Sequence, residues 1–348
     1  MPRYHELILN PGDGQTRLNN RIQLLRDIEA VTGRPVVVYA ANFRVPNIPN
    51  SIDHTDITPF SDLTRTVPGK KLDVLLHTPG GLAEAAERIV ALLRARFDDI
   101  RFAILHTCYS AGTMLAMSGD ALVLDDTSTL GPIDPQILYR DPQTGQSISI
   151  PTQTILDGFE NAKQAIKQDS DALGVYLPLL SKLDLHLFEI CKNAEKLSKS
   201  LVEQWLRDYM YKGDADAADK AAKATGFLSS HKDRLSHSRP ITIETAKGDD
   251  LKLSVVDLRD HARLRDLYQE LWAEVEWFVD STDTIKFFEN AYGVGFRRRF
   301  QQQQVSFQLP IPIPLPQPPG RAAADTQPPT WQAADCGGHA SSFAPLNS

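Results

Sequence analysis

The sequence predicts an α/β domain with a parallel sheet, followed by a helical region. Three apolar segments of strand length, 72–77, 101–106 and 121–124, alternate with two helical patterns, 82–97 and 110–118. Strands that are apolar throughout are typical of a sheet covered on both faces. A strand–helix–strand–helix–strand order implies parallel pairing through right-handed crossovers. The order of these five segments therefore predicts the fold class.

The residues before this unit lead into the sheet. Apolar side chains recur at helical spacing from Leu18 to Ile28, which predicts a short helix. The stretch RPVVVYAANF (34–43) is rich in β-branched residues between turn-forming residues, which predicts a buried strand. A loop is expected over 44–58, with one or two helical turns after it.

The remainder is expected to be mainly helical. Long periodic patterns fill residues 154–230, and another amphipathic helix is predicted over 264–280. A small β element is expected at 240–259, with its turn at Lys247–Asp250. Beyond residue 301 the chain is rich in glutamine and proline, which is typical of disorder. The expected units are a lead-in with a helix (1–33), an α/β core (34–153), a helical region (154–300) and a disordered tail (301–348).

Composition excludes several classes of protein. The chain of 348 residues has a net charge of -7, so it lacks the basic stripe that a nucleic-acid partner needs. The one basic run, Arg297–Arg299, is expected to be a solvated helix end. Three cysteines form neither a disulfide framework nor a zinc-site spacing. No signal-peptide h-region and no membrane-length apolar run is visible. We therefore expect a cytoplasmic protein without a membrane span, cofactor or metal.

Two turns at the ends of predicted strands can build a site for acyl transfer. This chemistry needs a nucleophile on a sharp turn and backbone N–H groups that face the developing oxyanion. Ser110 begins the helix after the second strand, and the Ala111 amide follows it. The turn TPGG (78–81) follows the first strand, so Gly80 or Gly81 can present a second amide. Open α/β sheets bind their ligands at this edge.

Three segments carry a resemblance to the serine dehydrogenase proteinase family: HTPGGLAEAAERIVALLR, YSAGTMLAMSGDALVL and STLGPIDPQI. This family is a branch of the Clp-type and signal-peptide-peptidase serine proteases, with a crotonase-like spiral of β-β-α units. The resemblance covers residues 34–140 well and extends more thinly through SHSRPITI. It implies a serine endopeptidase that acts on peptides or unfolded proteins and assembles as a homo-oligomer, with helices between 170 and 212 as subunit contacts. It also implies that Ser110 is the nucleophile and that Ala111, with Gly80 or Gly81, forms the oxyanion hole.

The proton acceptor departs from the Clp-type pattern. Clp-type proteases use a Ser-His-Asp triad, but the matching register here holds Asp134 and no histidine. Signal peptide peptidases use a lysine further along the chain, and the matching window holds Lys163 and Lys167. A lysine base must be neutral, which requires burial. We expect a Ser-Lys dyad with Lys163, and with Lys167 as the alternate base. Asp134, bracketed by two prolines, either orients the lysine or has a structural role.

Other titratable residues are weaker candidates. His77 and His106 end the two strands that carry the site, where a histidine is more often structural. His231 and His237 lie in a polar loop. The crowded segment IDHTD (52–56) has no further ligands at metal spacing and is expected to make polar loop contacts. Two other functions stay open: a crotonase-like acyl-CoA enzyme or binder, and a catalytically inactive scaffold.

Overall fold

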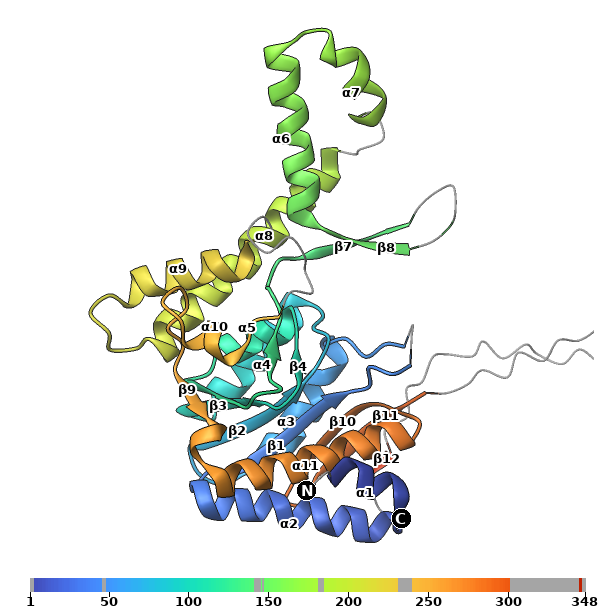
Figure 1. The fold of residues 1–348 in the computed structure, drawn as a ribbon, viewed down its shortest axis with the longest axis vertical. Coiled ribbons are helices and arrows are strands. Elements are labelled where there is room, and N and C mark those ends of the chain that lie inside the picture. Colours follow the sequence, from blue (N-terminus) through green and yellow to red (C-terminus); the bar gives the residue numbers. More distant parts are fainter. Residues whose placement is uncertain are drawn as a thin grey trace, which may run out of the picture.

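Among the residues that the structure describes, eight strands form one mixed sheet at the centre of the molecule (Figure 1). The computed structural model describes residues 3–45, 48–140, 145, 147–180, 185–230, 240–300 and 344–345. In sheet order, the strands are β12 (Ala344–Pro345), β11 (Gly295–Arg299), β10 (Thr284–Asn290), β1 (Val36–Ala41), β2 (Lys71–His77), β3 (Asp99–Ile104), β5 (Ala121–Leu124) and β9 (Val255–Asp257). Two short pairs lie outside it: β4 (Thr107–Cys108) with β6 (Thr129–Leu130), and β7 (Gln136–Arg140) with β8 (Ser147–Pro151).

The parallel part of the sheet matches the sequence prediction. The neighbours β1–β2, β2–β3, β3–β5 and β5–β9 all pair in parallel. All of β1 is buried, and so is all of β2 after Lys71. These strands have apolar side chains on both faces because helices cover both faces of the sheet. The predicted α/β fold class is confirmed.

The C-terminal part of the chain adds β9, β10, β11 and β12 to the same sheet, so the sheet extends beyond the expected 34–153 core, and β12 lies within the tail expected to be disordered (301–348). β10 pairs antiparallel with β1, and β11 with β10. The prediction missed β10 because the charged Lys286 and Glu289 interrupt its apolar pattern, yet both side chains are buried in ion pairs. The expectation that Arg297–Arg299 ends a helix is wrong, since these residues form part of β11.

The prediction of a small β element at 240–259 is wrong for the first half of that segment. A short helix, Ile243–Lys247, takes that place, because the Thr242 hydroxyl accepts a hydrogen bond from the Thr245 amide and caps it. The described helices are α1 (Arg3–Leu9), α2 (Gly14–Thr32), α3 (Ile57–Arg65), α4 (Ala83–Arg94), α5 (Ala111–Met117), α6 (Thr152–Gln168), α7 (Ala172–Leu180), α8 (Leu185–Trp205), α9 (Ala217–Ser229), α10 (Ile243–Lys247) and α11 (Ala262–Ser281).

Helices cover the two faces of the sheet in two layers. On one face α2 and α11 pack against each other and against β1, as the lower part of Figure 1 shows. On the other face α3, α4 and α5 form the layer that carries the predicted site. Along β1, Val36 and Val38 belong to the hydrophobic core on the α2 and α11 side, whereas Val37 and Tyr39 belong to the core on the α3, α4 and α5 side. This alternation is the period of a strand buried on both sides.

An arm of α6 and α7 projects from the body beyond the β7–β8 hairpin (Figure 1). In the described part of the chain, α6 packs mainly against α8, α7 and β8. α8 returns to the body and contacts α4, α5 and α9. Within the described ranges, no helix has both the length and the apolar character of a membrane span.

A cluster of buried charged side chains joins the start of β2 to its neighbours. The Asp73 carboxylate is fully buried and accepts hydrogen bonds from Arg34 Nε at 2.6 Å, Arg101 Nε at 2.9 Å and the Tyr268 hydroxyl at 3.0 Å. Burial, and then the Asp73 charge, raise the pKa of Tyr268 well above its usual value. The cluster joins three neighbouring elements, because Arg34 precedes β1, Arg101 lies on β3 and Tyr268 lies on α11.

Replacing Asp73 tests the contribution of this cluster. Asp73→Ala leaves the guanidinium groups of Arg34 and Arg101 without their shared carboxylate, so the free energy of unfolding should fall by about 3–5 kcal/mol. Urea denaturation measures the change. The control is Asp249→Ala, whose side chain is 97% exposed and which should change stability by less than about 0.5 kcal/mol. Equal effects of the two substitutions would contradict the assignment.

Candidate active site

Ser110 lies at a strained turn between β4 and α5. Its backbone has φ 51° and ψ -121°, and among the described residues only Lys252 is another non-glycine residue with positive φ. Such a conformation costs on the order of 1–3 kcal/mol and persists only where surrounding contacts impose it. A strained strand-to-helix turn is the geometry that exposes the serine nucleophile of α/β-hydrolases.

The TPGG turn packs directly against this serine. A Cβ at Gly80 would lie 2.6 Å from the Ser110 Cβ, and a Cβ at Gly81 would lie 2.2 Å from the Ile52 carbonyl oxygen. Both positions also have positive φ, 98° and 155°. The Ile52 amide donates to Gly80 O at 2.7 Å, and the Leu82 amide donates to Ile52 O at 2.9 Å. The turn is therefore held between Ile52 on one side and Ser110 on the other.

The amides that face this region differ in their partners. The Gly80 N–H donates to Thr78 Oγ1 at 3.2 Å, so it is engaged within the turn. Ala111 is the first residue of α5, so its N–H has no acceptor within the helix. Of the two glycines that the sequence left open, Gly81 is thus better suited to pair with Ala111 as an oxyanion donor.

The three motifs interlock around the nucleophile. A Cβ at Gly112 would lie 2.4 Å from the Thr78 methyl carbon, so the residue after Ala111 must be glycine for the turn to approach α5. The Thr113 hydroxyl donates to Cys108 O and Gly131 O, both at 2.9 Å. Contacts thus join TPGG to SAGT and SAGT to LGPID. This explains physically why the three segments occur together in the sequence.

Ser110 lines a cavity of about 370 Å³. Its wall is formed by the glycine turn, α5, α8 and the segment after Gly131, and among the lining residues there is no lysine or histidine. The sequence did not predict the part contributed by α8, which is far along the chain. The apolar lining consists of Pro79, Leu82, Ala83, Met114, Ile133, Pro135, Ala194 and Leu197, and the polar lining includes Ser51, Glu84, Gln136 and Ser198.

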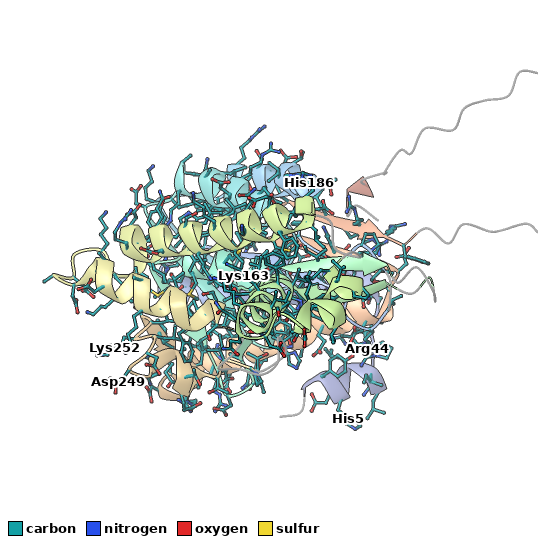
Figure 2. All side chains as sticks on the ribbon, turned by 90° about the horizontal axis from the view of Figure 1, so that it is seen from above. His5, Arg44, Lys163, His186, Asp249 and Lys252 are labelled. Atoms are coloured by element: carbon teal, nitrogen blue, oxygen red, sulfur yellow. The ribbon has the colours of Figure 1, made fainter. Side chains whose placement is uncertain are left out.

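The expected bases lie on the arm. The Lys163 Nζ forms an ion pair with Glu160 at 3.1 Å, and its side chain is 49% exposed. In the view from above, Lys163 lies on the arm toward the viewer (Figure 2). Lys167 follows one turn later on the same helix, α6. Asp134 is fully buried between two residues of the cavity wall, Ile133 and Pro135. The roles of these residues remain predictions.

His77 and His106 lie in a separate aromatic cluster. The His77 ring is 4.5 Å from both Phe43 and Trp272, and 5.8 Å from the His106 ring. Burial, and then the proximity of His106, lower the His77 pKa to about 3, so this imidazole stays neutral. Neither histidine lines the Ser110 cavity. Of the loop histidines considered as candidates, His231 and His237 lie outside the described residues.

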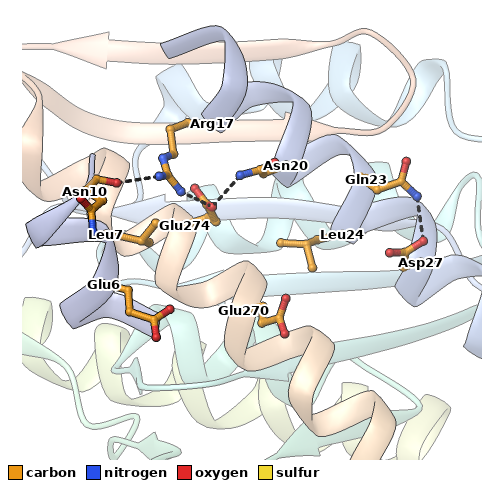
Figure 3. A pocket seen from close by; sticks show the side chains of 10 residues that line it. All are labelled: Glu6, Leu7, Asn10, Arg17, Asn20, Gln23, Leu24, Asp27, Glu270 and Glu274. Atoms are coloured by element: carbon orange, nitrogen blue, oxygen red, sulfur yellow. Dashed lines mark hydrogen bonds and ion pairs between the residues drawn. The ribbon is translucent and has the colours of Figure 1, made fainter. Parts of the chain in front are cut away.

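A larger cavity, of about 720 Å³, lies between α1, α2 and α11 (Figure 3). Several of its polar side chains pair with one another. Glu274 accepts hydrogen bonds from Arg17 at 2.8 Å and Asn20 at 3.2 Å, and Gln23 donates to Asp27 at 2.8 Å. None of the residues that line this cavity is a nucleophile in a strained turn, so the smaller cavity at Ser110 is the candidate active site.

Comparison with known proteins identifies the family of the chain. Residues 15–277 match the family described as ClpP-like SDH-type serine proteinase. The chain belongs to this family. The match confirms the resemblance carried by the three motifs and supports a serine peptidase in general terms. It spans most of the chain, including α8, α9 and most of α11.

Two uncharacterised proteins of Methanocaldococcus jannaschii are relatives. One is 31% identical over 178 residues, which is 51% of this chain and 51% of the relative, so the chain spans about half of that protein's length. The other is 26% identical over 260 residues, 73% of this chain and 78% of the relative.

Solved structures give weaker likenesses. A membrane-bound stomatin-specific protease, 1510-N, has a TM-score of 0.36 at 13% identity, covering 62% of this chain and 79% of that one. An enoyl-CoA hydratase from Mycobacterium avium subsp. paratuberculosis has a TM-score of 0.24 at 13% identity, covering 55% and 91%. At these scores the likenesses add no argument to the family match.

The strain at Ser110 can be measured through stability. Ser110→Gly should be more stable than Ser110→Ala by about 1 kcal/mol, because glycine adopts positive φ without a steric cost whereas alanine keeps the strain. Thermal and urea unfolding of the two variants measure the difference. Ser118→Gly against Ser118→Ala is the control, since Ser118 has φ -84° and glycine should bring no gain there. A Ser110→Gly variant less stable than Ser110→Ala would contradict the interpretation of the turn.

Proposed function

We propose that the chain is a serine endopeptidase with Ser110 as its nucleophile. The observation that supports this most is the strained backbone of Ser110, held against the Gly80 turn and lining a cavity. An acyl-CoA enzyme of the crotonase type uses an oxyanion hole but needs no serine in a strained turn. A scaffold without activity would have no reason to keep that strain.

In the proposed mechanism, Ser110 Oγ attacks the peptide carbonyl carbon and a general base takes the hydroxyl proton. The amides of Gly81 and Ala111 donate to the oxyanion of the tetrahedral intermediate, which is the largest expected contribution to the rate. The base then returns the proton to the leaving amine. Water hydrolyses the acyl-enzyme in the second half of the reaction.

The cavity indicates the preferred substrate. Met114, Ile133 and Leu197 give the wall next to Ser110 an apolar character. An apolar side chain of moderate size on the substrate gains about 25 cal/mol for each Å² that it buries there. We therefore propose cleavage next to apolar residues in peptides or unfolded segments, where such side chains are accessible.

The proposed base is a lysine of α6, Lys163 or Lys167. Because this helix stands away from α5 in Figure 1, the dyad requires either a bent arm or a second copy of the chain. Exposed apolar side chains on α7 favour the second copy: Leu173 is 46% exposed and Val175 is 70% exposed. An arm with such residues on its surface is suited to contact another protein surface. We propose a homo-oligomer in which the arm of one copy reaches the Ser110 cavity of another.

A fluorophosphonate probe tests the nucleophile. The wild-type chain should be labelled on Ser110, and Ser110→Ala should lose both the label and peptide hydrolysis, the latter by at least about 10³-fold. Peptide mapping by mass spectrometry identifies the labelled residue. Ser200→Ala is the matched control, since Ser200 is exposed on α8, does not line this cavity and should keep both activities. A wild-type chain that is neither labelled nor active would favour the scaffold or the acyl-CoA binder.

Mixing two inactive variants tests the origin of the base. Ser110→Ala and Lys163→Ala should each be inactive alone, and co-expression should restore roughly a quarter of wild-type hydrolysis if a dimer shares its sites. In the mixed dimer, the Lys163→Ala copy supplies an intact serine and the Ser110→Ala copy supplies an intact lysine to the same site. Lys167→Ala replaces Lys163→Ala in a parallel mixture to separate the two candidates. Full activity of both single lysine variants would exclude the Ser-Lys dyad on α6.

A further inference from the structure

A lysine that the sequence prediction missed is fully buried on β10. The Lys286 Nζ donates to Asp53 at 3.0 Å and to both carboxylate oxygens of Asp56 at 2.8 Å. Buried lysines are rare unless they are paired. Both carboxylates come from a short 3-10 turn, His54–Asp56, and from its capping residue Asp53. Lys286 therefore fixes residues 53–56 to β10, the strand next to β1.

The ion cluster includes a buried tyrosine on β1. The Tyr39 hydroxyl is fully buried and donates to Asp56 Oδ2 at 3.2 Å. Burial, and then the Asp56 charge, raise the Tyr39 pKa well above its usual value. The same Asp56 oxygen accepts the Asp53 backbone N–H at 3.0 Å. Lys286 and Tyr39 therefore both hold the carboxylate that fixes the backbone next to Ile52.

The ion cluster is connected to the glycine turn along the backbone. Asp53 follows Ile52, and the backbone N–H and C=O of Ile52 bond to Gly80 O and the Leu82 amide. The same residue also limits the position of Gly81, where a Cβ would collide with the Ile52 carbonyl. The ion cluster therefore acts on the turn through the Asp53–Ile52 backbone.

We propose that Lys286, Asp56 and Tyr39 are positioning residues that set the orientation of the Thr78–Gly81 turn. Their kinetic consequence rests on the proposed function, since it acts through the Gly81 amide as an oxyanion donor. Without the Tyr39 hydroxyl, Asp56 loses one of its donors, and the Asp53–Ile52 backbone that bonds to the turn is held less firmly. The Gly81 amide then points at the oxyanion for a smaller fraction of the time.

Tyr39→Phe is the sharpest variant. It removes one hydroxyl and keeps the ring, which packs 5.4 Å from Phe60 and 4.9 Å from Phe288. Complete loss of an oxyanion donor costs about 10²–10³ in kcat, so partial misorientation should lower kcat about 10-fold, with KM changed by less than about 2-fold. Lys286→Met should lower kcat further but can also prevent folding, so the proposal is decided on Tyr39→Phe.

Tyr268→Phe is the matched control. Tyr268 is also fully buried and its hydroxyl also donates to a buried aspartate, Asp73, at 3.0 Å. Asp73 lies near the start of β2, whereas Thr78 follows the end of that strand. Both variants should lose a similar amount of stability, but only Tyr39→Phe should lose kcat.

Hydrogen exchange provides a readout that does not need peptidase activity. In Tyr39→Phe, peptides that contain residues 78–82 should exchange about 10-fold faster at the Gly80 and Leu82 amides, and in Tyr268→Phe they should exchange at the wild-type rate. Faster exchange together with lower kcat supports the proposal. Faster exchange in a chain whose wild type has no peptidase activity supports the positioning role and refutes the proposed function.

The opposite results are equally clear. An active wild type whose Tyr39→Phe variant keeps kcat and the wild-type exchange of residues 78–82 would overturn the positioning role and leave the proposed function intact. Faster exchange with unchanged kcat in an active enzyme would also overturn it, because the turn would then move without consequence for the reaction. Equal loss of kcat in Tyr39→Phe and Tyr268→Phe would assign the effect to general stability.

Discussion

The backbone of the Thr78–Gly81 turn lies so close to Ser110 that no side chain fits at Gly80, and the geometry of the whole site depends on this approach. Parallel pairing continues past the ends of β2 and β3, since the Thr78 amide donates to Thr107 O and the Tyr109 amide donates to Thr78 O, both at 3.1 Å. The register between β2 and β3 therefore determines where the Ser110 turn lies relative to the glycine turn. These bonds offset the strain of Ser110, which alone would relax toward an ordinary helix start.

Buried tyrosine–aspartate pairs lie near both ends of β2, and they differ in the segments of the chain that they join. Tyr268 and Asp73 join β2 to its neighbours near its start, where the chain has no chemistry to position. Tyr39 lies opposite Leu76, near the end of β2, and its hydroxyl donates to Asp56. On the proposed positioning role, similar interactions contribute stability at one edge of the sheet and orientation at the other. The carboxyl edge is where an open α/β sheet binds its ligands, so this difference follows from the fold.

The sequence was sufficient where structure is determined locally. Unbroken apolar runs predicted β1, β2, β3 and β5, and the TPGG and SAGT turns predicted a site at the ends of β2 and β3. It was insufficient where charges are buried. The strand that contains Lys286 and Glu289 was missed because the partners of these charges, Asp56 and Arg21, lie 230 and 268 residues away in the chain. The α8 wall of the cavity was missed for the same reason, since it depends on long-range packing and not on a local pattern.

The position of the proposed base has a consequence for control of the activity. A serine hydroxyl without a base is a weak nucleophile, and no lysine or histidine is found among the residues that line the Ser110 cavity. On the proposed mechanism a single copy therefore holds a strained serine and its oxyanion amides, but it hydrolyses peptides only when an arm brings Lys163 or Lys167 to the cavity. That contact would also take the Lys163 side chain, which is 49% exposed on the arm, out of water. Assembly and activation of the base would then be one event.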